Sequence, residues 1–362
     1  MSPPGHYDGR HRPAAARPPG FRTLGGVRLL AHTDNGEQVP AITLERVFTA
    51  WAFEPVPLFL VVLAAGLYLL GLRVLRRRGD RWPAWRTVSF CVGGLGALVL
   101  ATSSSLATYD TVLLSMHMVQ HMMLSMVAPV FLALGAPVTL ALRTLPGGAR
   151  RRLLGVLHSK VAAVLAFPPV AFALFIVSPW ALYFSGWYDA TLRSAALHDL
   201  LHLHFVVVGC LFFWPLLGLD PVPGRVVYPL RMLTVFATLP FHAFLGVTIM
   251  TMEDLIAGEW YSSANRDWPP SPTDDQNLAG GILWGSGEVI GIVFFGVLFV
   301  QWVRHSMREA AREDRRIDRA EAAHSRSVAP RPGGGSGVDE GGEPVASPQQ
   351  RTSPQSKAGH RP

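Results

Sequence analysis

Two pairs of histidines stand inside long apolar stretches of the sequence, where ionisable side chains are costly and therefore indicate function. His117 and His121 are four residues apart in SMHMVQHMML, and His198 and His202 have the same spacing in LHDLLHLHF. Residues four apart lie on one face of a helix. The two imidazoles of each pair can therefore reach one metal ion.

Two more ionisable side chains interrupt later apolar stretches and extend the same predicted site. His242 lies in LPFHAFLG and Glu288 in LWGSGEVIG. The predicted metal ligands are therefore His117, His121, His198, His202, His242 and Glu288. Glu288 has two alternative roles, as a proton site or as the acceptor that orients a histidine N–H. His204 points to another face of its helix, and we interpret it as a packing residue.

Copper is the metal that this set of side chains favours. Imidazole nitrogen suits copper, zinc, iron and nickel, whereas the thioether sulfur of methionine favours Cu(I). The methionines around the first histidine pair are Met116, Met118, Met122, Met123 and Met126. Methionine is also ordinary apolar filler in helices, so zinc and haem iron stay open as alternatives.

Seven apolar stretches must position these residues. The chain is 49% apolar and only 16% charged, against about 25% charged residues in soluble domains. Uncharged apolar runs of roughly 18 residues or more predict membrane spans. They cover residues 55–74, 84–107, 111–134, 162–184, 197–218, 229–252 and 280–303. The sequence therefore predicts an all-α, polytopic membrane helix bundle of seven transmembrane helices.

Two of these spans carry further local signals. The second and third are separated only by a few residues around Tyr109 and Asp110, which predicts a tight hairpin. The fourth contains Pro168-Pro169 and Pro179, which predict a kink or a late helix start. The paired glycines Gly93 and Gly94, with Gly96, suit close helix packing.

The basic residues of the short loops predict the orientation. Arginines gather after the first, third, fifth and seventh spans, whereas the intervening loops are acidic or mixed. The N-terminus is then outside and the C-terminus cytoplasmic. The N-terminal segment disagrees, because six arginines, Arg46 included, precede the first span. We attribute the net charge of +7 to this topology and expect no nucleic-acid partner.

Depth along each helix places the ionisable residues in one leaflet. With Asp110 as the outer boundary of its span, His117 and His121 lie roughly 10 and 16 Å deep. The same count puts the other four predicted ligands roughly 7 to 16 Å below the outer boundary. All six therefore fall in the outer half of a core about 30 Å thick. This shared depth favours one common site.

The remaining sequence divides around this bundle. We predict a disordered N-terminal tail over residues 1–45, a transmembrane domain over 46–305, a charged cytoplasmic helix extension over 306–326 and a disordered C-terminal tail over 327–362. The residues that fit an interfacial aromatic belt are Trp51, Trp180, Tyr183, Trp187, Tyr188, Trp260 and Tyr261.

Five blocks of this sequence together resemble a known family. They are WAFEPVPLFLVVLAAGLYLLG, SMHMVQHMMLSMVAPVFLALGAPV, HDLLHLHFVVVGCLFFWPLLGLDP, PLRMLTVFATLPFHAFLGVTIM and DQNLAGGILWGSGEV. Over residues 45–305 the chain is similar to the seven-helix CtaG-like cytochrome c oxidase assembly factors of the bacterial plasma membrane. The resemblance implies a protein without enzymatic activity that delivers copper to heme-copper oxidase subunits, with the five histidines as candidate ligands.

Other functions fit parts of the same pattern. Histidines from two helices could bind one haem iron axially in a membrane electron carrier. A copper transporter would need a polar path through both leaflets, and the cytoplasmic half of the predicted spans carries no comparable set of ionisable residues. A scaffold for oxidase subunits, surrounded by membrane lipid, is a third alternative.

Overall fold

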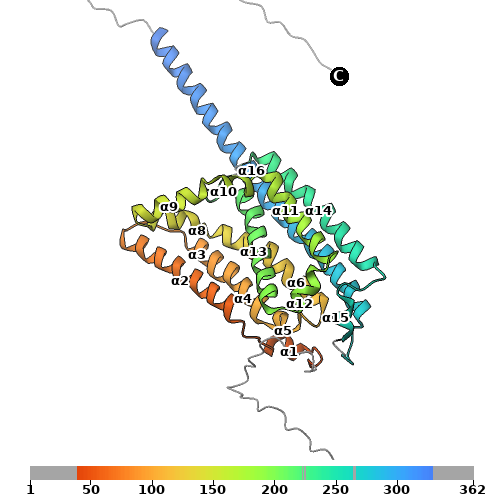
Figure 1. Cartoon of the computed structure of the whole chain (residues 1–362). Coiled ribbons are helices and arrows are strands. Elements are labelled where there is room, and N and C mark those ends of the chain that lie inside the picture. Colours follow the sequence, from red (N-terminus) through yellow and green to blue (C-terminus); the bar gives the residue numbers. More distant parts are fainter. Residues whose placement is uncertain (1–38, 222, 224–225, 264–265, 329–362) are drawn as a thin grey trace, which may run out of the picture. The chain divides into compact units, whose positions relative to one another are not determined.

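The computed structural model describes residues 39–221, 223, 226–263 and 266–328, and these residues form helices and no strand (Figure 1). This confirms the predicted all-α class. The predicted tails fall mostly on residues 1–38 and 329–362, which lie outside the described residues. The chain divides into two compact units, residues 1–304 and 305–362, and all six predicted ligands lie in the first.

The helices follow one another with short connections. The first nine elements are α1 (Leu44–Thr49), α2 (Pro55–Arg77), α3 (Ala84–Val88), η1 (Ser89–Leu95), α4 (Gly96–Ser103), α5 (Ser105–Tyr109), α6 (Leu114–Met122), η2 (Met123–Val127) and α7 (Ala128–Leu134). The next nine are α8 (Pro137–Thr144), α9 (Gly147–Leu157), α10 (Lys160–Leu165), α11 (Pro168–Tyr183), α12 (Trp187–Leu192), α13 (Ala195–Leu217), α14 (Tyr228–Thr251), α15 (Gly258–Ser263) and α16 (Pro272–Val328).

Within the part of the chain that the structure describes, six helical segments are long and apolar enough to cross a membrane, which indicates a multi-pass membrane protein. They are Pro55–Arg77, Ala84–Tyr109, Leu114–Thr144, Ala195–Leu217, Tyr228–Thr251 and Pro272–His324. The remaining predicted span, 162–184, is divided between α10 and α11. α11 begins only at Pro168, which is the late start that the two prolines predict. Its 16 residues extend about 24 Å, less than the roughly 30 Å of a hydrocarbon core.

The second and third spans form the predicted hairpin around Asp110, and each contains a π-helical stretch, η1 and η2. A Cβ atom at Gly93 would lie 2.5 Å from Cδ1 of Phe131, and one at Gly94 would lie 2.6 Å from Cδ2 of Leu132. The close packing predicted for these glycines is therefore confirmed, with α7 as the neighbour. At Gly96 the nearest atom would be 3.9 Å away, which is an ordinary contact.

Helix α13 runs through the middle of the bundle and packs against α7, η2, α11 and α12 (Figure 1). Its buried side chains join the main hydrophobic core. Gly209 allows the closest approach, because an added Cβ would collide with the carbonyl oxygen of Ser125 in η2. This contact sets the distance between α13 and the chain segment that continues from α6. The two helices that carry the histidine pairs are therefore held together by backbone packing.

Two buried aspartates fix the ends of the third span. Asp275 of α16 accepts hydrogen bonds from the backbone N–H of Leu114 at 2.6 Å and from the hydroxyl of Ser115 at 2.5 Å, at the start of α6. Asp220 accepts from the backbone N–H and the hydroxyl of Thr139 at 2.7 and 2.5 Å, at the start of α8. Each carboxylate satisfies N–H groups that a helix start leaves unpaired. The segment that carries His117 and His121 is thus anchored near both ends.

We expect Asp275→Ala to lower the free energy of unfolding by about 1–3 kcal/mol, because it leaves buried donors of α6 without an acceptor. Thermal unfolding of the purified protein in detergent measures the change. Asp274→Ala is the matched control, since this exposed neighbour accepts a side-chain hydrogen bond only from Ser271. Equal stability of the two variants would contradict the anchoring role of Asp275.

Candidate metal centre

Asp110, His198 and His202 form a buried cluster, which we call the aspartate–histidine triad. Nε2 of His198 lies 2.9 Å from Oδ2 of Asp110, and Nε2 of His202 lies 3.9 Å from the same oxygen. Each residue offers one ligand atom, and these three atoms lie within 4.8 Å of one another. All three side chains are buried. Among the described residues, the triad is the one group of three or more side chains that are close enough together to bind a metal ion.

Local structure explains how residues so distant in sequence meet. Asp110 follows the last residue of α5 in the hairpin loop, and His198 and His202 occupy the first two turns of α13. The hydroxyl of Ser194 accepts from the N–H of Leu197 and so caps the start of α13. The spacing of four residues puts both imidazoles on one face, with their ring centroids 4.4 Å apart. That face points at the hairpin loop.

Electrostatics make the triad attractive to a cation. Burial raises the pKa of the Asp110 carboxyl. The hydrogen-bonded imidazole of His198 and the nearby His202 lower the pKa by more than burial raises it. The net pKa lies below the ordinary value, so the group is a carboxylate at neutral pH. A buried carboxylate is stable only when a cation or hydrogen-bond donors compensate its charge.

Gln120 of α6 joins the triad to the second span. Its amide NH₂ donates to the carbonyl oxygen of Ala101 at 2.9 Å, so its Oε1 faces His202, whose Nε2 lies 3.0 Å away. Nε2 of His202 therefore carries a proton in this metal-free arrangement, and a metal ion bound at the triad would replace that proton. Such a partner orients an imidazole and selects its tautomer.

The first histidine pair forms a separate group around one tyrosine, which we call the tyrosine-bridged pair. The hydroxyl of Tyr183 lies 3.1 Å from Nε2 of His117 and 2.7 Å from Nδ1 of His121. A hydroxyl has one proton to donate, so it donates to one imidazole and accepts from the other. Nδ1 of His117 is buried and has no hydrogen-bond partner among the described residues. This nitrogen is therefore available as a metal ligand.

The last two predicted ligands lie apart from both groups. His242 is buried on α14, where its Nδ1 lies 3.3 Å from the carbonyl oxygen of Thr238 and its ring packs against Phe175. Glu288 is half-buried on α16. Its carboxylate makes no hydrogen bond or ion pair with any described residue. Of the six predicted ligands, only His198 and His202 thus belong to the triad.

The triad has the donor set of an incomplete metal site. Tetrahedral sites with bonds of about 2.0–2.1 Å hold their ligand atoms roughly 3.3 Å apart. The separations of 2.9 and 3.9 Å bracket this value, so small side-chain movements suffice. Two imidazoles and one carboxylate leave a fourth position open for an incoming or outgoing ligand. Met118, Met122 and Met126 instead lie in the hydrophobic core.

Three polar residues of this region carry no functional role in the sequence prediction. Asp110 serves there only as a boundary marker, Tyr183 as a belt residue, and Gln120 not at all. The belt interpretation is wrong for Tyr183, and also for Tyr188 and Tyr261, whose hydroxyls lie 2.7 Å apart inside the protein. Burial raises the pKa of both Tyr188 and Tyr261. A glutamine inside an apolar span was the signal that could have identified Gln120.

Comparison with known proteins identifies relatives of this chain and its family. The chain is 43% identical over 284 residues to an uncharacterized protein of Mycobacterium bovis and equally to one of Mycobacterium tuberculosis. It is 40% identical over 281 residues to one of Mycobacterium leprae. These matches cover 75–76% of this chain but only 42–43% of each relative, so the chain spans less than half of their length. No solved structure matches the chain.

The family model described as "Cytochrome c oxidase caa3 assembly factor" matches residues 66–305. This range contains the triad, the tyrosine-bridged pair, His242 and Glu288. It also contains most of the blocks on which the resemblance rests. The chain therefore belongs to the caa3-type cytochrome c oxidase assembly factor family.

Proposed function

We propose that this protein binds copper at the aspartate–histidine triad and passes it to a subunit of a heme-copper oxidase in the bacterial plasma membrane. The observation that carries this proposal is the buried carboxylate of Asp110 between two imidazoles, at 2.9 and 3.9 Å. Copper is the metal that the protein binds and releases, and it is not a permanent cofactor. The protein itself performs no catalytic step.

The proposed topology has seven spans, with the N-terminus outside and the C-terminus in the cytoplasm. α11 supplies the fourth span together with the short α10 that precedes it. The arginine-rich loops then face the cytoplasm, following the positive-inside rule. The hairpin loop with Asp110 and the start of α13 face outward, so copper reaches the triad from the outer side.

An exchangeable site suits a protein that must release its metal. Three protein ligands leave one coordination position open, and the receiving oxidase subunit can enter there. Nδ1 of His117 offers the next unpartnered nitrogen donor in the described interior. Imidazole must be neutral to bind a metal, so binding weakens as the pH falls and the histidines become protonated.

Transport of copper through the whole membrane is less well supported. At the opposite end of the bundle, the buried Asp220 caps α8 and the buried Arg231 donates to the carbonyl oxygens of Val226 and Leu216. These groups satisfy helix ends. They resemble structural caps more than a second metal site.

The double variant His121→Ala/His202→Ala tests the proposed function, because it removes one histidine from the triad and one from the tyrosine-bridged pair. We expect purified protein to lose its copper, and cells that carry only this variant to assemble a copper-deficient oxidase. Metal analysis and oxidase activity measure the two results. His158→Ala, at an exposed histidine outside both groups, is the control. Normal copper content together with normal oxidase maturation in the double variant would refute the proposal.

A further inference from the structure

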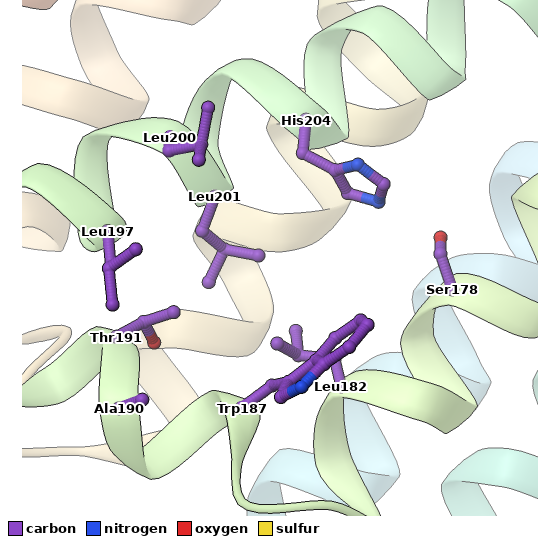
Figure 2. A pocket seen from close by; sticks show the side chains of 9 residues that line it. All are labelled: Ser178, Leu182, Trp187, Ala190, Thr191, Leu197, Leu200, Leu201 and His204. Atoms are coloured by element: carbon purple, nitrogen blue, oxygen red, sulfur yellow. The ribbon is translucent and has the colours of Figure 1, made fainter.

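A cavity of about 440 Å³ lies between α11, α12 and α13 (Figure 2). Its walls include Ser178 and Leu182 of α11, Trp187 and Ala190 of α12, and Leu201 and His204 of α13. Its volume falls within the roughly 300–1,000 Å³ of small-molecule sites, which are mostly apolar with a few placed polar groups. None of its lining residues belongs to the triad or to the tyrosine-bridged pair. It is therefore a separate feature of the bundle.

Two polar side chains face one another across this apolar space. Figure 2 shows the imidazole of His204 and the hydroxyl of Ser178 directed toward each other from α13 and α11. Neither group has a hydrogen-bond partner among the described residues. The sequence favours a packing role for His204, but its ring lines the cavity wall instead.

The hydroxyl of Ser178 makes no hydrogen bond to its own helix, unlike the hydroxyls of two serines in other helices of this chain. The hydroxyls of Ser125 and Ser286 donate to the carbonyl oxygens four residues earlier, at 2.7 and 2.5 Å. This is the usual way to satisfy a serine inside a membrane helix. A neutral imidazole N–H and a serine O–H are both donors. Each group can also accept a hydrogen bond, and toward a ligand that carries only acceptors the cavity presents two donors.

The position of the two donors excludes a charged head group. His204 lies ten residues after Ser194, which corresponds to roughly 15 Å along α13. A phosphate at that depth would require a cation, since buried charges are stable only when paired. The cavity lining contains no Arg or Lys. Arg193, near the start of α13, is already paired with Asp189 at 2.6 Å.

One lining residue also favours a flat ligand. The indole of Trp187 forms part of the cavity wall and is 69% exposed. Aromatic faces of this kind stack on planar rings. We propose that the cavity binds the head group of a neutral, lipid-soluble quinone, with His204 and Ser178 donating hydrogen bonds to its carbonyl oxygens.

Competitive photolabelling tests this site in the full-length protein, reconstituted in phosphatidylcholine nanodiscs. An azido-quinone is the label, decylubiquinone the competitor and decylbenzene the competitor without carbonyl groups. We expect label on peptides of α11–α13 that decylubiquinone removes and decylbenzene does not. His204→Leu should weaken competition at least tenfold, and His204→Gln, which keeps a donor, should recover part of it. Ala190→Phe should block labelling by filling the cavity from α12.

His158→Leu is the control for the loss of a histidine elsewhere, and thermal unfolding checks that each variant is folded. Labelling of equal strength in the wild type, His204→Leu and Ala190→Phe would overturn the proposal. So would equal competition by decylbenzene, which would assign the cavity to apolar chains such as lipid tails. Copper does not enter these measurements, so their outcome is independent of the proposed copper function.

Discussion

Replacing both His198 and His202 by alanine should weaken copper binding by more than about 100-fold, whereas replacing both His117 and His121 should change it by less than about threefold. Loss of a residue that merely orients a metal ligand already costs about 10- to 100-fold in affinity. The first variant removes two direct ligands and leaves only the carboxylate of Asp110. The second leaves the triad whole, because the pair it removes is held by Tyr183.

Titration of the purified apoprotein with copper, against a competing chelator of known affinity, measures both variants. Each loses two buried imidazoles, so they are matched for general destabilisation. Asp110→Asn adds a third test, because it keeps the shape of the side chain and removes its charge. We expect it to weaken binding by at least tenfold. The triad would be the wrong site if His117→Ala/His121→Ala lost as much copper affinity as His198→Ala/His202→Ala.

Gly209→Ala should lower the free energy of unfolding by about 1–3 kcal/mol, and Gly209→Val by more, because the added atoms have no space. A Cβ would collide with the carbonyl oxygen of Ser125 and would lie 2.6 Å from Cγ of Pro129. Both obstacles belong to the backbone or to a rigid ring, so neither can rotate away. Ser125 also donates to the carbonyl oxygen of His121. Strain at Gly209 is therefore transmitted to the helix that carries the first histidine pair.

Thermal unfolding in detergent measures this effect, with Gly66→Ala as the matched control. Gly66 lies inside α2, and a Cβ added there would meet no neighbouring side chain or helix within 4 Å. Alanine should stabilise that helix by roughly 0.5–1 kcal/mol. The same substitution is thus expected to lower the free energy of unfolding at Gly209 and to raise it at Gly66. This difference separates the effect of packing from that of helix propensity. A stabilising effect at Gly209 would contradict the close approach of α13 and η2.

The apolar pattern of the sequence predicted most of the fold because membrane spans are determined locally. A run of apolar residues must become a helix in lipid, where each backbone polar group needs an internal partner. The predicted spans 55–74 and 229–252 correspond closely to α2 (Pro55–Arg77) and α14 (Tyr228–Thr251). Even the late start of α11 could be predicted, since Pro168 lacks the N–H of a helix interior.

The composition of the site depended on contacts between helices, which spacing within one helix does not reveal. The i, i+4 rule identified His198 with His202 and His117 with His121, and both pairs do share a face. Asp110 hydrogen-bonds to His198, which lies 88 residues away in the sequence. Tyr183 hydrogen-bonds to His117 and His121, which lie 66 and 62 residues away. Glu288 shares the predicted depth of the others, but its carboxylate bonds to neither group of histidines among the described residues.

The sequence by itself thus determined the helices, the clustering of histidines toward one end and the family. Only the tertiary structure decided which histidines share a carboxylate, that Tyr183 is an interior residue, and that His204 lines a cavity. The physical reason is that depth follows from the rise along one helix. The rotation of each helix and its neighbours follow from packing, as at Gly209, where two backbones touch.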